Sequence, residues 1–292
     1  MKVPPYRRRV WEGFSFLIHL IIMTAFLAEP LPKILYSCYH HHSREGEQFV
    51  PEHILSFQLA GSMTINDGEG EQHFINGDIR LHQRNHLLKF YKQLPADGSE
   101  YKSLSIFFDQ ATLRNFSNEY GYASTRTHES KAVTGIKPTQ QYKSYLQSLH
   151  PYEQIMQRGN EDLLALKVKE ALLILLKTNP EVKDILFDFT EPGKIDLEAF
   201  MVKNYKFNVS MERFAYLTGR SLATFKRDFE KLFNTTPGRW LQQQRLKEAH
   251  HLIKEKGRRP SDVYLEVGFE DLSHFSFAFK KAYGVGPSML QG

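Results

Sequence analysis

Two basic residues, Lys226 and Arg227, stand between two phenylalanines that lie four positions apart, Phe225 and Phe229. Positions four apart share one face of a helix, so the rings are expected to pack inward and to leave the basic side chains in solvent. Lysine and arginine can both contact guanine O6 and N7, and arginine does so with two bonds. The chemistry that this spacing offers is recognition of nucleic-acid bases and phosphates.

The same aromatic spacing returns 50 residues further along the chain. The first copy has rings at positions 225, 229 and 233 and a proline at 237, and the second has rings at 275, 279 and 283 and a proline at 287. Such an internal repeat predicts two copies of one structural unit. An antiparallel helical array without any binding role is the purely structural alternative.

Each copy is preceded by a short apolar segment, 211–217 or 263–267, and by a glycine, Gly219 or Gly268. A helix, a glycine-containing turn and a second helix form the helix-turn-helix layout. Ser221 can cap the second helix of the first unit, and Asp271 that of the second. Asn234 and Gly284 suit left-handed helix ends. From Thr236 and Pro237, a long helix ending near Gly257 is expected to hold the two units at a fixed separation.

If the rings face the core, the neighbouring positions of each second helix face outward. In the first unit these groove-facing positions are Ala223, Lys226 and Arg227, and in the second they are Ser273, Ser276 and Phe277. Hydroxyls discriminate bases poorly, and phenylalanine offers only apolar contact, for instance to a thymine methyl. Lys280 and Lys281 are expected to meet phosphates, and a phosphate contact is also the alternative role for Arg227. The full set of candidate DNA contacts is Ser221, Ala223, Thr224, Lys226, Arg227, Leu272, Ser273, His274, Ser276, Phe277, Lys280 and Lys281.

The charge distribution agrees with a polyanion as partner. From Lys194 to the end there are 17 Lys and Arg against 11 Asp and Glu, whereas the rest of the chain has 21 against 22. The whole basic excess of this chain, with its net charge of +5, therefore belongs to the C-terminal third.

The segment from about Asp196 to Gly292 resembles the DNA-binding domain of the AraC/XylS family of transcription regulators. The resemblance is carried by residues 219–229, 236–237, 245–246, 249, 267–276, 278–281, 284 and 287. It departs from the family pattern at Tyr264, where alanine is usual, and at Phe277, where arginine is frequent. It implies a sequence-specific DNA-binding protein that controls transcription, with double-stranded DNA as partner and RNA polymerase as a second candidate partner.

The front half predicts β-structure followed by helices. Residues 53–109 are predicted to form short strands, for example at 54–59, 78–81 and 103–108, separated by turn signals, which suggests a small barrel or sandwich. A helix at 160–177 is apolar on more than one side, so either core packing or a dimer interface accounts for it. This half resembles, more loosely, the cupin-like sensory domains of the same family through residues 34–38, 43–48 and 51–53. The resemblance implies an effector, small molecule or protein, and allows a homodimer.

We looked for catalytic and metal-binding patterns as well. His40, His42 and Glu47 fit part of a cupin metal motif, but the flanking glycines and the later histidine are missing. A solvated loop is the preferred interpretation, and no metal or cofactor is expected. No phosphate loop, nucleophile elbow or paired-carboxylate signature is recognised, so an enzyme is not expected. A cupin-type enzyme or binding protein with a helical appendix is the alternative from another class.

The uncharged run 14–28 follows a basic cluster and looks like a signal peptide, although it is short for a membrane span. Secretion, a membrane-anchored sensor and a leader without targeting value are the three interpretations, and we favour the last. A lone cysteine, Cys38, cannot form an intrachain disulfide and fits a reducing compartment. The expected location is therefore cytoplasmic.

The sequence thus predicts an α+β protein. An N-terminal cupin-like barrel or sandwich with helices is followed by an all-α domain with two helix-turn-helix units. The expected divisions are a leader at 1–30, an effector and dimerisation domain at 31–189, a linker at 190–195 and a DNA-binding domain at 196–292.

Overall fold

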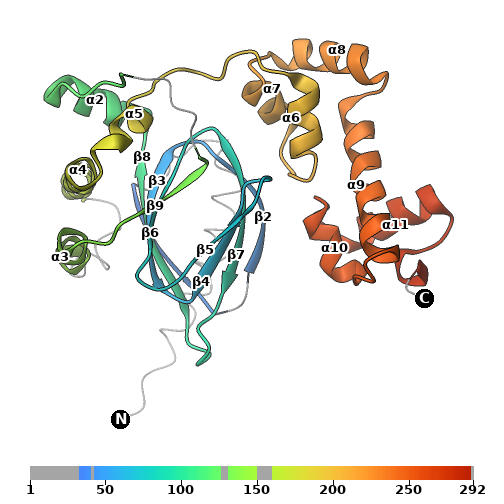
Figure 1. Ribbon diagram of the computed structural model, residues 1–292, viewed down its shortest axis with the longest axis horizontal. Helices are drawn as coiled ribbons and strands as arrows, with labels where there is room; N and C mark the ends of the chain where they lie inside the picture. Colours follow the sequence, from blue (N-terminus) through green and yellow to red (C-terminus); the bar gives the residue numbers. More distant parts are fainter. Residues whose placement is uncertain (1–32, 41–42, 126–130, 150–159, 291–292) are drawn as a thin grey trace.

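The computed structural model describes residues 33–40, 43–125, 131–149 and 160–290. A β part flanked by helices and an all-helical part lie side by side in Figure 1, which confirms the predicted α+β class. The run 14–28 and His42 lie outside the described residues. Among the described helices, none combines the length and the apolar character needed to cross a membrane.

The β part consists of two antiparallel sheets that face each other (Figure 1). The three strands predicted from the sequence are present as β3, β6 and β8, all in the larger sheet. In sheet order this sheet contains β1 (Ile34–Tyr39), β8 (Tyr101–Phe108), β3 (His53–Ala60), β6 (Ile79–His82) and β9 (Val133–Ile136). The smaller sheet contains β2 (Ser43–Val50), β7 (His86–Gln93), β4 (Ser62–Asn66) and β5 (Glu71–Phe74).

Helices cover the outer face of the larger sheet (Figure 1). Side chains alternate along β3, so that Leu55 and Phe57 join the helices in one core. Leu172 and Leu175 are fully buried in this core, so core packing accounts for most of the apolar surface of the predicted 160–177 helix. The helices are α2 (Gln110–Tyr120), α3 (Gln140–Leu149), α4 (Glu161–Thr178), the 3-10 turn η2 (Pro180–Val182) and α5 (Lys183–Leu186).

The C-terminal part is entirely helical. Both predicted helix-turn-helix pairs are present, as α7 with α8 and as α10 with α11, and α9 is the predicted long connecting helix. α10 begins three residues before the predicted start, because Pro260 occupies its first turn. The elements are α6 (Leu197–Asn204), α7 (Met211–Leu217), α8 (Leu222–Phe233), α9 (Pro237–Lys254), α10 (Pro260–Glu266), α11 (Leu272–Tyr283) and the 3-10 turn η3 (Pro287–Leu290).

The turn of the first unit is closely packed against the chain that enters the helical part. Gly219 has a φ of +63°, and a Cβ on it would lie 2.3 Å from the backbone carbon of Gly193. Gly284 has a φ of +80°, but a Cβ there would have no neighbour within 4 Å. A side chain at position 284 would thus cause backbone strain alone, whereas one at position 219 would cause backbone strain and a steric clash.

We expect Gly219→Ala to lower the free energy of unfolding more than Gly284→Ala does. The left-handed backbone costs an alanine about 1–2 kcal/mol at either site, and the clash at Gly219 adds about 1–3 kcal/mol. Urea unfolding of both variants, followed by Trp240 fluorescence, measures the difference. Equal losses would contradict the close packing of the turn against Gly193.

Candidate nucleic-acid interface

The two candidate recognition helices, α8 and α11, begin and end as the sequence predicts. The Ser221 hydroxyl accepts the Thr224 amide at 3.3 Å, and the Asp271 carboxylate accepts the His274 amide at 2.7 Å. These bonds satisfy amides that the first turn of a helix leaves unpaired. α8 ends at left-handed Asn234 and α11 at left-handed Gly284, so each helix has a defined length.

The repeated rings form the inner face of each unit. Phe225 and Phe229 have no exposed surface, and the Phe229 ring packs edge-on to Trp240 of α9, with ring centres 5.6 Å apart. Phe275 and Phe279 are equally buried in the second unit. Because these rings fix the rotation of α8 and α11, the opposite face of each helix is held toward solvent.

The outer face of α8 is basic. Ala223, Lys226 and Arg227 are exposed, and Thr224 is half-buried, with its hydroxyl 3.0 Å from that of Ser221. The Arg227 side chain is 64% exposed, and its one ion pair among the described residues is with the adjacent Asp228, at 3.8 Å. Such a weak surface pair leaves the guanidinium able to reach a DNA base or phosphate.

The outer face of α11 has a different chemistry. Phe277 is 69% exposed, which is unusual for a large apolar side chain, and Leu272 is 39% exposed. Ser276 is half-buried, and the other predicted contacts on α11 are exposed: Ser273, His274, Lys280 and Lys281. The two faces therefore offer unequal means of recognition, one charged and one largely apolar and hydroxylic.

Arg245 of α9 joins the two units. Its Nε donates to the carbonyl of Tyr205 at 2.8 Å and one terminal nitrogen donates to that of Phe207 at 2.6 Å; both lie in the segment between α6 and α7 that packs in the core of the first unit. Its other terminal nitrogen donates to Gly268 in the turn of the second unit at 2.8 Å. A Cβ on Gly268 would lie 2.6 Å from the carbonyl of Lys206, so the two units approach closely at this point. The arginine fork therefore sets the angle between them.

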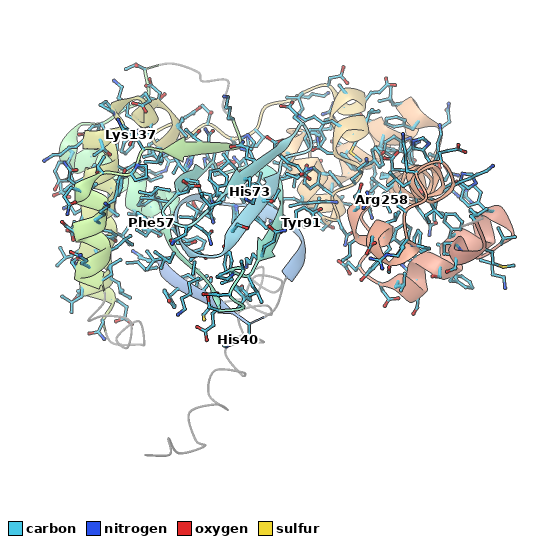
Figure 2. All side chains as sticks on the ribbon, turned by 60° about the horizontal axis from the view of Figure 1, so that its bottom comes forward. His40, Phe57, His73, Tyr91, Lys137 and Arg258 are labelled. Atoms are coloured by element: carbon cyan, nitrogen blue, oxygen red, sulfur yellow. The ribbon has the colours of Figure 1, made fainter. Side chains whose placement is uncertain are left out.

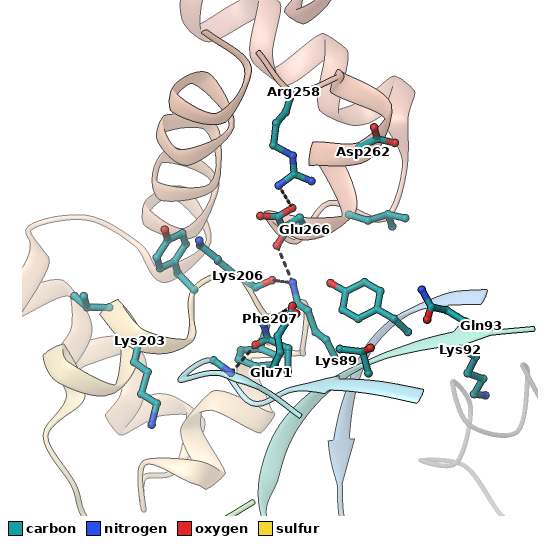
Figure 3. A pocket seen from close by; sticks show the side chains of 17 residues that line it. Glu71, Lys89, Lys92, Gln93, Lys203, Lys206, Phe207, Arg258, Asp262 and Glu266 are labelled. Atoms are coloured by element: carbon teal, nitrogen blue, oxygen red, sulfur yellow. Dashed lines mark hydrogen bonds and ion pairs between the residues drawn. The ribbon is translucent and has the colours of Figure 1, made fainter. Parts of the chain in front are cut away.

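Lys89 of β7 links the front part to the same junction. Its ammonium donates to the carbonyls of Lys206 and Glu266, each at 2.8 Å. Lys206 lies in the segment between α6 and α7, which leads into the first unit, and Glu266 belongs to α10 of the second unit. Only 8% of the Lys89 surface is exposed. Figure 3 shows this bridge beside a cleft of about 840 Å³ between the two parts, lined by β4, β5, β7, α6 and α10.

Further contacts between the two parts lie beside this bridge. Leu87 of β7 belongs to the apolar core of the first helical unit. The Arg213 guanidinium lies 3.7 Å from the centre of the Phe49 ring. Burial raises the pKa of the Tyr216 hydroxyl, which stays protonated and donates to Asn85 at 3.1 Å. Motion of the β part is thus mechanically connected to the first unit.

The connecting segment between the two parts is fixed to the β part by Arg84. Its guanidinium donates to the carbonyl of Thr190 at 2.6 Å and to that of Asp188 at 3.2 Å. No helix or strand covers residues 188–196. The sequence indicated neither Arg84 nor Lys89, because their partners lie about a hundred positions or more further along the chain.

Comparison with known proteins identifies both parts. A family model described as "Helix-turn-helix domain" matches residues 214–292, and one described as "ExsA N-terminal regulatory domain" matches residues 53–185. The chain is 22% identical to the HTH-type transcriptional regulator ExsA of Pseudomonas aeruginosa, over 79% of this chain and 82% of ExsA. It is 30% identical to the transcriptional activator VirF of Yersinia enterocolitica, over 32% of this chain and 35% of VirF.

The chain belongs to the AraC family of transcription regulators. This regulator binds DNA through its helix-turn-helix domain and carries an N-terminal regulatory domain. Among solved structures, ToxT of Vibrio cholerae is similar over 90% of this chain and 98% of that chain, with 13% identity and a TM-score of 0.46. The relatives are transcription regulators and not enzymes.

We expect Arg245→Met to lower the free energy of unfolding of the regulator by about 2–4 kcal/mol, since a hydrogen bond to a charged group contributes about 1.5–3 kcal/mol and Arg245 is only partly buried. Unfolding in urea, monitored by Trp240 fluorescence, measures this loss. Arg239→Met is the matched control on the same helix, because Arg239 is exposed. A loss no larger than that of the control would show that the fork does not hold the units.

Proposed function

We propose that α8 and α11 enter successive major grooves on one side of double-stranded DNA. The observation that carries this proposal is the pair of outward faces held on one connecting helix by Arg245. The 18 residues of α9 give a rod about 27 Å long, which is most of the roughly 34 Å between successive grooves. The helical part, 196–292, is the proposed DNA-binding domain.

We assign unequal roles to the two helices. Arg227 reads a guanine through O6 and N7, and Lys226 lies beside it on the same exposed face. Phe277 contacts a thymine methyl, and Ser273 and Ser276 add hydroxyl contacts with little discrimination. The remaining candidate residues hold the helices on the backbone or flank these contacts: Ser221, Ala223, Thr224, Leu272, His274, Lys280 and Lys281.

Arg227→Ala is expected to weaken binding to the best operator by roughly 1–3 kcal/mol and to relax the preference at one guanine. Phe277→Ala is expected to cost less and to shift the preference mainly at an A·T pair, because an apolar contact to a methyl is lost. Selection of binding sites from random DNA, carried out with each variant of the full chain, measures both effects.

Lys280→Ala is the matched comparison for these two variants. Loss of a phosphate contact is expected to weaken binding to all DNA sequences alike and to reduce the slope of affinity against salt concentration by about 1. If Arg227→Ala behaves in this uniform way while Phe277→Ala changes the guanine preference, the roles assigned to α8 and α11 are wrong.

We further propose that the regulatory domain controls DNA binding through the contact made by Lys89. Because this ammonium holds one carbonyl in the segment that leads into the first unit and one in the second unit, a shift of β7 would move both units together. The unknown effector, a small molecule or a protein, is proposed to act at the cleft beside Lys89 (Figure 3). Lys206, Arg258 and Glu266 line this cleft from the DNA-binding side, so an occupant would contact both domains.

Lys89→Met is expected to loosen the junction, since two charge-assisted bonds of about 1.5–3 kcal/mol each are lost. Amide hydrogen exchange at residues 205–207 and 266–268 is expected to rise at least about tenfold, and the DNA affinity of the full chain is expected to change. Lys143→Met removes an exposed lysine from α3 and is the charge-matched control. If amide exchange becomes faster but the DNA affinity equals that of the Lys143→Met control, the contact is structural and does not carry regulation.

Other parts of the proposal concern partners and location. RNA polymerase is a proposed partner of the DNA-bound regulator, and the proposed location is the cytoplasm, since its DNA target lies there. A homodimer through the regulatory domain, 31–189, is proposed to use the part of α4 that the core does not cover. There Leu163 is 42% and Leu166 is 62% exposed. Residues 190–195 are the proposed linker.

A further inference from the structure

Three side chains with metal-binding atoms converge at one end of the regulatory domain: Cys38, His40 and Glu100. Their candidate ligand atoms all lie within 4.8 Å of one another. Cys38 Sγ is 3.1 Å from Glu100 Oε2, and His40 Nδ1 is 3.3 Å from Glu100 Oε1. In Figure 2 the labelled His40 lies far from Arg258 of the DNA-binding domain, so this cluster is separate from the interdomain cleft.

The sheet produces this convergence. Cys38 and His40 are two positions apart along extended chain, and residues two apart point to the same face. β1 pairs with β8 in a register that places Tyr39 opposite Tyr101 and Cys38 opposite Lys102. Continuing this register by one step brings Glu100 opposite His40. The paired ends of β1 and β8 thus bring the backbones of the three residues close together.

The donor set and the spacing suit one class of ion. Thiolate, imidazole and carboxylate together are ligands for zinc and similar divalent transition metals. With zinc bonds of about 2.3 Å to sulfur and 2.0–2.2 Å to nitrogen and oxygen, tetrahedral ligand atoms are about 3.4–3.6 Å apart. Cys38 Sγ and His40 Nδ1 approach different oxygens of Glu100, at 3.1 Å and 3.3 Å, and one ligand atom from each residue lies within 4.8 Å of the others, so small side-chain rotations reach this spacing. Because the His40 side chain is 64% exposed, water can supply a fourth ligand.

We propose that Cys38, His40 and Glu100 bind a divalent transition metal ion of the zinc class. Bound there, the ion would fasten the end of β1 to the start of β8. Cys38 now donates its proton to Glu100, and metal binding replaces that proton with the ion and releases it to solvent. The site differs from the motif considered in the sequence, since it shares only His40 with it.

Lys102 opposes this site and so provides a test of its electrostatics. Its ammonium lies 3.2 Å from Glu100 Oε2 and competes for the carboxylate with an incoming cation. The Lys102 side chain is 40% exposed, so it can turn toward solvent when an ion binds. Removing this charge should strengthen metal binding, whereas removing any of the three ligands should weaken it.

The experiment is titration of the metal-free full chain with Co²⁺, followed by absorbance and by calorimetry. Cys38 is the one cysteine of the 292-residue chain, so a sulfur-to-cobalt charge-transfer band reports this side chain alone. We expect one equivalent of Co²⁺ to produce the band and Zn²⁺ to displace it. Cys38→Ser should abolish the band. His40→Gln and Glu100→Gln should weaken binding at least about tenfold, since loss of even an outer partner costs that much.

Two further variants complete the test. Lys102→Gln should tighten Co²⁺ binding about thirtyfold, as expected for removal of a unit charge about 4 Å from a divalent ion in water. His73→Gln, which changes an exposed histidine on β5, should leave binding unchanged. Absence of the band, its persistence at full strength in Glu100→Gln, or cobalt binding without sulfur ligation would overturn the proposal. Circular dichroism of each metal-free variant verifies that it folds.

Discussion

The geometry of the DNA-binding domain depends on one side chain that satisfies three backbone carbonyls at once. Arg245 bonds to Tyr205, Phe207 and Gly268, and these carbonyls come from segments more than 60 positions apart in the sequence. A planar guanidinium holds its donors at fixed angles, so the three acceptors are positioned relative to one another as well as to α9. Lysine, as a point charge, could not fix an orientation in this way.

This constraint makes Lys89 a single contact to a junction that both units share. Lys89 binds Lys206, which lies between two carbonyls held by Arg245, and Glu266, which lies two residues before the third. The junction formed by residues 205–207 and 266–268 is therefore bonded both by Arg245 of α9, within the DNA-binding domain, and by Lys89 of β7, in the regulatory domain. Under the proposed regulation, a change in the Lys89 contact would reach α8 and α11 together, because the Arg245 contact already joins the two units.

The sequence predicted the features whose causes are local. Ring spacing, caps and turn glycines predicted the bounds of α7, α8, α9 and α11 to within a few residues, since these signals depend on residues only a few positions apart. The strands β1, β2 and β9 were not predicted, because each is stabilised by a partner strand far along the chain, and β9 (Val133–Ile136) is also short. Helices α2, α3 and α6 were also not predicted. The contact of Lys89 with the junction has no local signature.

The two helix-turn-helix units show which positions a repeat must preserve. Phe229 and Phe279 occupy matching buried sites, and Gly219 and Gly268 both adopt left-handed turns where a Cβ would collide with backbone. Substitution at these positions would cost folding energy in either copy. The outward positions carry no such cost, so Arg227 in one copy corresponds to Phe277 in the other. One scaffold thus presents two surfaces with different chemistry, and the rigid junction between them lets a single protein combine a charged and an apolar means of recognition.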